Sequence, residues 1–210
     1  MKQTLAAGIT ALLLFGCVET ETSVDRVSGR NLQGGFGPNE EMVSYPSLRS
    51  VSRRGVDAQT GIPYSYSSSR RAEVQTPDGN NWLGGCISDP IRDTQRCHLN
   101  LPRILHVFVD GSGSPETICI ASHDFPGRRG AIRVAGAPMM RSNENGCFSG
   151  SAAKAIERQL QRGGTVYTEY YEWPYDHPSQ RSAVIGSSFP LAQRLFRFSR
   201  NAPAELFSQR

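Results

Sequence analysis

Three neighbouring residues, Ser122, His123 and Asp124, supply the side-chain types of a hydrolytic triad: a nucleophile, a general base and a carboxylate that orients the base. A periplasmic hydrolase that uses His123 with Ser122 or Asp124 is therefore one hypothesis for the function. The spacing argues against it, because consecutive side chains in an extended strand point to opposite faces. The chain also lacks the Gly-x-Ser-x-Gly turn that exposes the nucleophile of many hydrolases. We therefore expect a protein that is not an enzyme.

The other polar residues do not suggest a metal or cofactor site. His98 and His106 fall in predicted strands, His177 lies in a predicted loop, and no Cys-x-x-Cys or paired His motif accompanies them. No Gly-rich phosphate loop with a following Lys is present either. The formal charge of +4 is weak and evenly spread, which argues against nucleic-acid binding. We expect no metal ion, no cofactor and no nucleic-acid partner.

An aromatic segment is the strongest candidate for a partner-binding site. Tyr170, Trp173 and Tyr175 lie close together in the sequence and combine apolar rings with polar tips, which suits protein interfaces and sugar faces alike. Arg128 and Arg129, in a Pro- and Gly-containing loop, form a second candidate. Strand alternation predicts that Tyr170 faces away from Tyr167 and Tyr171, so that one of these two faces belongs to the core.

The first residues of the chain resemble a bacterial export signal. Lys2 precedes an apolar run, Leu5 to Phe15, which is short for a membrane-spanning helix and typical of a signal peptide. The run ends in Leu14-Phe15-Gly16-Cys17, the pattern of a lipoprotein cleavage site. The sequence therefore predicts a signal peptide over 1–16 and lipidation of Cys17, since several acyl chains make a stable anchor. The residue after Cys17 is Val18 and not the Asp that retains lipoproteins in the inner membrane. This favours the outer membrane, with the protein facing the periplasm or the cell surface.

Four further cysteines suggest disulfide bonds, which an oxidising periplasm permits. Three pairings of Cys86, Cys97, Cys119 and Cys147 are open. We favour Cys86 with Cys97, because they flank a hairpin-like segment. Cys119 with Cys147 would then connect a strand to the start of a predicted helix.

The chain divides into a tether and a folded part. Residues 17–77 are rich in Ser, Gly, Arg and Gln without a sustained hydrophobic period, which predicts a disordered tether after the lipidated cysteine. The segment Tyr64 to Arg71 within it mixes aromatic and basic residues, as a contact with glycan or a partner would, but we favour a solvated linker. Residues 78–200 predict a globular domain, and residues 201–210 a frayed tail.

The expected domain is mainly β, an antiparallel sandwich or barrel-like fold with one or two short helices and disulfide bonds. Short apolar runs separated by Gly, Pro and Asn turns predict its strands, with candidates at Trp82–Ile87, Gln95–Leu101, Leu105–Val109, Thr117–Ala121, Ala131–Val134 and Thr165–Trp173. Ser151 to Arg162 predicts a helix capped by Ser151, with an apolar stripe that includes Ala153, Ile156 and Leu160. A second helix is predicted after Pro190.

Several of these features resemble the invasion-associated locus B family of exported bacterial proteins. The resemblance depends on Asn81-Trp82-Leu83-Gly84-Gly85-Cys86, on Cys97, on Ile132-Arg133-Val134 and on Asn145-Gly146-Cys147-Phe148-Ser149-Gly150 before the predicted helix, and it covers roughly Asn80 to Phe198. It implies a disulfide-bonded, β-rich envelope protein of a family implicated in entry into host cells.

These patterns lead to one expected function. The protein is predicted to be an envelope-anchored lipoprotein that acts as a non-enzymatic binding or structural module, in envelope assembly or host interaction. Its expected partners are the membrane, through the lipid anchor, and an envelope protein or glycan.

Overall fold

The structure, a computed structural model, describes residues 34–45 and 49–208. In this part of the chain, thirteen strands form two antiparallel sheets, accompanied by two α-helices and a short 3-10 helix. The predicted signal peptide and Cys17 lie outside the described residues. The prediction of a mainly antiparallel β fold with two helices and disulfide bonds is confirmed.

The larger sheet has nine strands in the described residues, in the order β1-β2-β3-β4-β5-β6-β7-β8-β11. Its strands are β1 (Glu41–Tyr45), β2 (Ser50–Val56), β3 (Pro63–Ser67), β4 (Ala72–Gln75), β5 (Asn81–Asp89), β6 (Thr94–Leu101), β7 (Leu105–Val109), β8 (Pro115–Ile120) and β11 (Cys147–Ser149). The smaller sheet, in the order β10-β9-β12-β13, contains β9 (Ala131–Val134), β10 (Met140–Arg141), β12 (Thr165–Tyr170) and β13 (Ser179–Val184).

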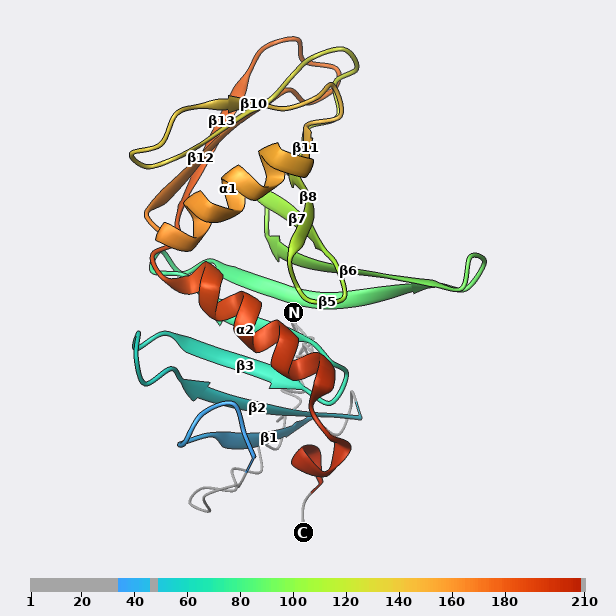
Figure 1. Cartoon of the computed structure of the whole chain (residues 1–210), viewed down its shortest axis with the longest axis vertical. Helices are drawn as coiled ribbons and strands as arrows, with labels where there is room; N and C mark the ends of the chain where they lie inside the picture. Colours follow the sequence, from blue (N-terminus) through green and yellow to red (C-terminus); the bar gives the residue numbers. More distant parts are fainter. Residues whose placement is uncertain (1–33, 46–48, 209–210) are drawn as a thin grey trace, which may run out of the picture.

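Two helices, α1 (Gly150–Arg162) and α2 (Ser188–Asn201), supply much of the cover for these strands. Figure 1 shows α2 lying across one face of the larger sheet, while α1 lies between the smaller sheet and β8. The predicted stripe of α1 is buried at Ala153, Ile156 and Leu160. Both helices begin earlier than predicted, α1 after Ser149 and α2 after Ser187, and neither flanking Ser makes a side-chain cap hydrogen bond.

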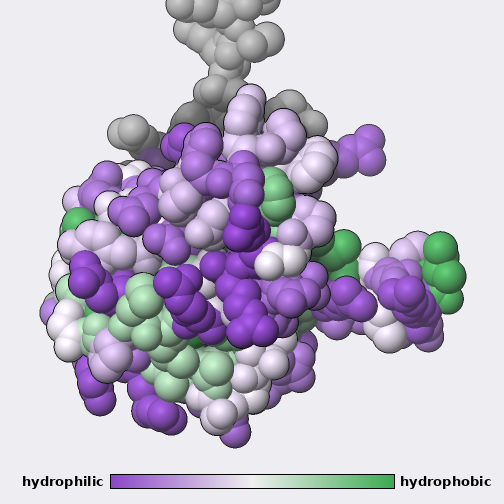
Figure 2. Space-filling model, turned by 90° about the horizontal axis from the view of Figure 1, so that it is seen from above, coloured by the Kyte–Doolittle hydropathy of each residue, from purple (hydrophilic) through white to green (hydrophobic). Residues whose placement is uncertain are grey.

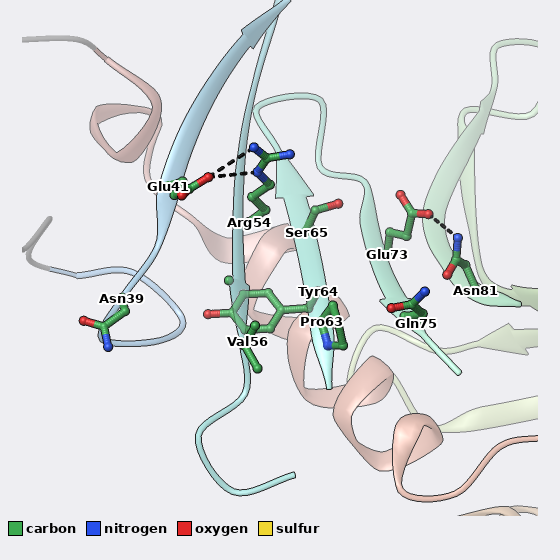
Figure 3. Close-up of a pocket in the computed structure, with 11 residues that line it drawn as sticks. Asn39, Glu41, Arg54, Val56, Pro63, Tyr64, Ser65, Glu73, Gln75 and Asn81 are labelled. Carbon is green, nitrogen blue, oxygen red and sulfur yellow. Dashed lines mark hydrogen bonds and ion pairs between the residues drawn. The ribbon is translucent and has the colours of Figure 1, made fainter. Parts of the chain in front are cut away.

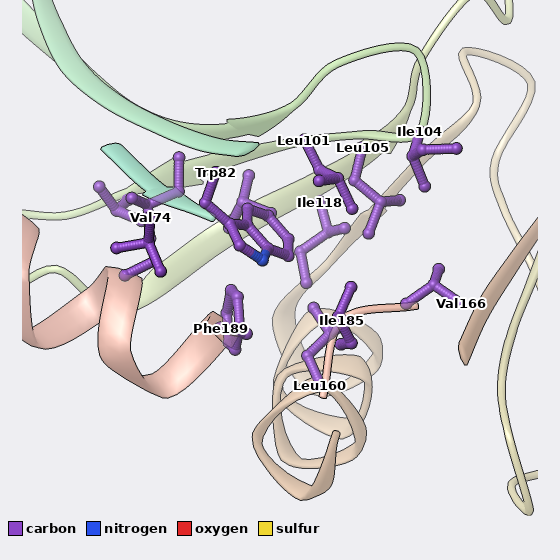
Figure 4. Close-up of a cluster of buried hydrophobic side chains, with 14 of the residues drawn as sticks. Val74, Trp82, Leu101, Ile104, Leu105, Ile118, Leu160, Val166, Ile185 and Phe189 are labelled. Carbon is purple, nitrogen blue, oxygen red and sulfur yellow. The ribbon is translucent and has the colours of Figure 1, made fainter. Parts of the chain in front are cut away.

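The core lies between the two helices and the two sheets (Figure 4). Trp82 is fully buried, its ring centroid is 5.1 Å from that of Phe189, and its indole N–H donates to the Ser188 hydroxyl at 3.0 Å. In β6 and β7 every second side chain points into this core, as the sequence predicts, at Cys97, Leu99, Leu101, Leu105, Val107 and Val109. The apolar alternation therefore fixes which face of each strand is buried.

The predicted disordered tether over 17–77 is wrong for its described part, because β1 to β4 lie within it. Tyr64, Tyr66, Ala72 and Val74 are all buried on the side of the sheet that α2 covers. The segment Tyr64 to Arg71 is consequently β3 and a turn, and neither tyrosine is free for a partner. β3 and β4 are short, and polar residues alternate with the buried ones along them, so their composition resembles that of a disordered segment.

A buried ion pair holds the start of the described chain to this sheet. Glu40 and Arg53 have side chains only 2% exposed, and their closest atoms, Oε2 and Nη1, lie 3.1 Å apart. The Glu40 carboxylate also accepts hydrogen bonds from the hydroxyls of Tyr64 and Tyr66, at 2.9 and 2.7 Å. Burial, together with the Glu40 carboxylate, raises the pKa of Tyr66 to about 12. Such a charge-assisted network exists only where the chain is folded around it.

Both favoured disulfide pairings are confirmed. Cys86 is bonded to Cys97 and Cys119 to Cys147, and each pair occupies directly opposite positions on adjacent strands with Cα atoms 4.0 Å apart. The second bond joins β8 to β11, the strand that leads into α1. The segment between Cys86 and Cys97 is a β-hairpin, as the sequence suggests.

The predicted frayed tail is also wrong for its described part. Residues Ala204–Phe207 form the 3-10 helix η2, in which Leu206 is buried and the Phe207 ring lies 5.8 Å from that of Tyr66. Apolar contacts therefore hold this segment against the larger sheet. Among the described helices, none combines the length and hydropathy needed to cross a membrane.

Candidate functional site

Two loops that are distant in the sequence meet at one end of the molecule. The first, residues 121–130, connects β8 to β9, and the second, residues 171–178, connects β12 to β13. The carboxylate of Asp124 accepts the Trp173 backbone N–H at 2.6 Å, and the Tyr171 carbonyl accepts the N–H groups of Asp124 and Phe125 at 3.1 and 3.2 Å. In Figure 1 these loops lie at the top, at the opposite end from β1 and β2.

An ion pair adds to these backbone contacts. The Arg128 guanidinium donates a hydrogen bond to the Asp176 carboxylate, which raises the pKa of Arg128. The same guanidinium lies 5.9 Å from the centre of the Tyr171 ring. Apart from Tyr170, the two candidates identified in the sequence therefore lie on adjoining loops and, with Phe125, form one surface. We call it the two-loop patch: Phe125, Arg128, Arg129, Trp173 and Tyr175.

His123 forms hydrogen bonds with the backbone of both loops. Its Nδ1 accepts the backbone N–H of Tyr171 at 3.2 Å, and its Nε2 lies 3.1 Å from the Arg128 carbonyl oxygen. Because a carbonyl can only accept, these partners assign the proton to Nε2. Gly146, at φ 73°, packs so closely that a Cβ there would lie 2.7 Å from the His123 ring. Both ring nitrogens therefore have structural hydrogen-bond partners.

The structure does not assemble Ser122, His123 and Asp124 into a triad. The Ser122 hydroxyl accepts a hydrogen bond from Arg181 at 3.0 Å, and Asp124 accepts the Trp173 N–H. No hydrogen bond joins any two of the three side chains within the described residues. The three residues lie in the loop between β8 and β9 and not in a strand, so the contacts of this loop, and not strand alternation, direct their side chains to different partners.

Trp173 and Tyr175 are 61% and 60% exposed, which is unusual for large aromatic side chains. The Phe125 and Trp173 ring centroids are 5.2 Å apart, so the exposed indole is supported by a neighbour on the other loop. Arg129 is exposed beside Arg128. Aromatic and Arg side chains held in fixed loops are typical of the residues that dominate protein–protein binding energy.

Tyr170 does not belong to this surface, and its predicted role in partner binding is wrong. It is the last residue of β12, is only 5% exposed, and packs against the guanidinium of Arg181 at 4.6 Å. Tyr167, on the opposite face, is 42% exposed. Alternation therefore holds along β12, and it places Tyr170 in the core.

Two surface features were not anticipated from the sequence. The first is a groove of about 610 Å³ over β1 to β5, in the segment predicted to be a tether. Alternation of buried residues at Tyr64 and Tyr66, then at Ala72 and Val74, is the sequence signal that could have revealed these strands.

The second feature is the tip of the β5–β6 hairpin, where Ile91 is 93% exposed. Figure 2 shows this hairpin projecting from the body and ending in hydrophobic surface. The sequence alone did not indicate it, because strand alternation does not predict how far a hairpin extends beyond its neighbours.

Among the residues that the structure describes, no group of three His, Cys, Asp or Glu side chains is placed to hold a metal ion. Comparisons with protein-family models, curated proteins and solved structures found no match. The resemblance to the invasion-associated locus B family stays a prediction from the sequence.

Proposed function

We propose that this protein is a non-enzymatic binding module of the bacterial envelope, lipid-anchored at Cys17 in the outer membrane, which captures a protein partner with the two-loop patch. The observation that carries this proposal is the pair of exposed rings, Trp173 and Tyr175, on loops that hydrogen bonds hold in place. A loop that is already ordered loses little conformational entropy on binding, so its aromatic contacts contribute more of their energy to affinity.

Two further observations support a binding role over a hydrolytic one. Each of Ser122, His123 and Asp124 is committed to a hydrogen bond that shapes the loops. The patch also lies at the end of the molecule opposite β1, the first described strand, so an anchor N-terminal to β1 would leave it accessible to a partner (Figure 1). Envelope assembly and host interaction are the two settings in which such a module would act.

The test is site-specific photocrosslinking in intact cells. A photoreactive phenylalanine analogue replaces Trp173 or Tyr175, and Tyr167, an exposed tyrosine on β12, serves as the matched control. We expect a discrete protein adduct from positions 173 and 175 and not from 167. Trp173→Ala should weaken binding of the purified adduct partner roughly 30-fold, the effect of losing about 2 kcal/mol at an interface hot spot. Equal adducts at all three positions would contradict the proposal.

The anchor is tested separately by the intact mass of the protein extracted from membranes. The expected mass is that of residues 17–210 plus lipid, with four thiols that react only after reduction. A mass that includes residues 1–16, or one without lipid, would reject the anchor while leaving the binding test intact.

A further inference from the structure

A groove crosses the face of the larger sheet opposite α2 (Figure 3). Its volume of about 610 Å³ lies within the range of small-molecule sites in proteins. It is formed by β1 to β5, whereas the two-loop patch belongs to the connections of the smaller sheet. The groove is therefore a separate surface, and a ligand in it would leave the two-loop patch free.

The register of the strands explains why these side chains gather. Arg54 lies opposite Ser65, and Ser65 opposite Glu73, so that the three form a row across β2, β3 and β4. Side chains two positions apart share a face of a strand, which places Val56, Pro63 and Gln75 in the next row. Neighbouring strands are about 4.8 Å apart, so each row offers a contact point at that interval.

The polar contact points of the groove include both donors and acceptors. The Asn81 amide donates to one carboxylate oxygen of Glu73 at 2.6 Å, and Figure 3 shows Gln75 beside this pair. Ser65 and Gln75 line the groove and make no side-chain hydrogen bond with the described residues. The Ser65 hydroxyl and both the N–H₂ and the C=O of the Gln75 amide can therefore bond to a ligand. A ligand that both donates and accepts hydrogen bonds would satisfy these groups.

An apolar surface lies next to these polar groups. Val56 is 57% exposed and lies directly opposite Pro63, which is also exposed. These two side chains offer a C–H surface on β2 and β3, three and two strands away from Asn81 on β5. The groove therefore suits a ligand with an apolar face and a polar rim, which is the character of a sugar ring.

Charge argues for a neutral ligand. Arg54 donates to Glu41 from Nε and Nη2 at 3.2 and 3.1 Å, which neutralises its charge within the groove. An anionic ligand would meet the unneutralised carboxylate of Glu73, which forms no ion pair among the described residues. A basic peptide could pair with that carboxylate, and the salt dependence of binding distinguishes it from a neutral sugar.

We propose that this groove binds a short segment of a neutral glycan chain. The sugar hydroxyls bond to Ser65, Glu73, Gln75 and Asn81, and the C–H faces of the rings pack on Val56 and Pro63. The chain runs across the strands, along the two rows of contact points.

The test is calorimetric titration of the full chain in detergent with neutral tetrasaccharides of glucose, N-acetylglucosamine, mannose and galactose. At least one should bind with a dissociation constant of about 1 mM or tighter. Gln75→Ala should weaken that binding roughly 2- to 12-fold, the effect of one lost hydrogen bond. Gln180→Ala, an exposed glutamine on β13, is the matched control and should leave it unchanged.

Two further measurements separate this proposal from its alternatives. Binding of a neutral sugar should change little between low and high salt, whereas binding of a lysine tripeptide to Glu73 would weaken as salt screens it. Trp173→Ala should have no effect on sugar affinity, so that failure here and failure of the two-loop patch are distinguishable. The proposal is overturned if none of the sugars binds, if Gln75→Ala binds normally, if only the lysine peptide binds, or if Trp173→Ala abolishes sugar binding.

Discussion

The carboxylate of Asp124 accepts a hydrogen bond from the backbone N–H of Trp173 at 2.6 Å, although the two residues are 49 positions apart in the sequence. This contact joins the connection between β8 and β9 to the connection between β12 and β13. It determines where the most exposed aromatic side chain of the two-loop patch is held.

Asp124→Ala should release the second loop without unfolding the protein, because the loops are exposed and the core is elsewhere. The Trp173 amide should lose its protection from hydrogen exchange, measured by NMR, and partner binding should weaken through the cost of reordering the loop. Asp93→Ala, at the tip of the β5–β6 hairpin, is the control. Unchanged exchange at Trp173 would mean that the other contacts alone hold the loop.

Gly146→Ala should be more harmful than Gly127→Ala. Both glycines have positive φ, 73° and 74°, so both substitutions incur a similar backbone strain of about 1–2 kcal/mol. Only at Gly146 would the new Cβ collide with the ring of His123, whereas the space around Gly127 is empty. Thermal melting should therefore show a larger loss for Gly146→Ala, with shifted resonances in both loops. Equal losses would show that His123 moves aside at no cost.

Arg53 and Arg54 are neighbours on β2 whose ion pairs lie on opposite faces of the sheet. Arg53→Ala leaves the buried Glu40 carboxylate without its cationic partner. It should reduce the free energy of unfolding by about 3–5 kcal/mol. Arg54→Ala breaks an exposed pair with Glu41 and should cost at most about 1 kcal/mol. Urea unfolding measures both.

Glu40→Gln serves as a milder version of the Arg53 change if Arg53→Ala fails to fold. It removes the charge but keeps a hydrogen-bonding side chain among Arg53, Tyr64 and Tyr66. A small effect of both Arg53→Ala and Glu40→Gln would mean that the segment before β1 is not part of the stable fold.

The two disulfides should contribute unequally to stability. Chain-entropy estimates give about 2.8 kcal/mol for Cys86–Cys97 and about 3.6 kcal/mol for Cys119–Cys147, because the second bond closes a longer loop, of separation 28 against 11. Paired Cys→Ala variants, unfolded in urea, test this order. Loss of Cys86–Cys97 should also speed hydrogen exchange selectively within residues 87–96. The reverse order of stability would indicate that native-state contacts outweigh loop closure.

Acidification should destabilise the protein through His98 and His106. Burial lowers both pKa values from the ordinary 6.5, and the charge of His106 lowers that of His98 further. Between the folded and unfolded pKa values the unfolded chain binds more protons, so the free energy of unfolding falls as pH decreases below 6.5. Melting temperatures at about pH 7.5 and about pH 5.5 should show this fall.

The double variant His98→Gln, His106→Gln isolates this effect. Its melting temperature should change less over the same pH range, while His177→Gln, in an exposed loop, should behave as the parent protein does. If the double variant and the parent respond identically to pH, other groups control the acid sensitivity.

Features that depend on neighbours in the sequence could be predicted from the sequence. The alternation of Leu105, Val107 and Val109 identifies a half-buried strand, and the spacing of Ile156 and Leu160 identifies the buried face of α1. The favoured disulfide pairing was correct as well, because the two members of each pair are successive cysteines in the sequence and flank one segment of the chain.

Short strands with a polar face were missed for a physical reason. Glu73 and Gln75 on β4 are as polar as a linker, and only their alternation with Ala72 and Val74 marks a strand. Burial of those two small apolar residues becomes favourable only when α2, more than a hundred positions later, covers them. Composition alone therefore predicted a disordered segment.

The sequence by itself determined the type of fold and the residues from which a binding surface could be made, and it favoured one of three cysteine pairings, which the structure confirms. Only the tertiary structure decided that Trp173 meets Phe125, that Tyr170 is buried, and that Glu73 and Gln75 line a groove. Periodicity records which side of a strand is buried, since that depends on residues two positions apart. Which strands become neighbours depends on the packing of the whole chain, and that packing brings together residues that no local pattern connects.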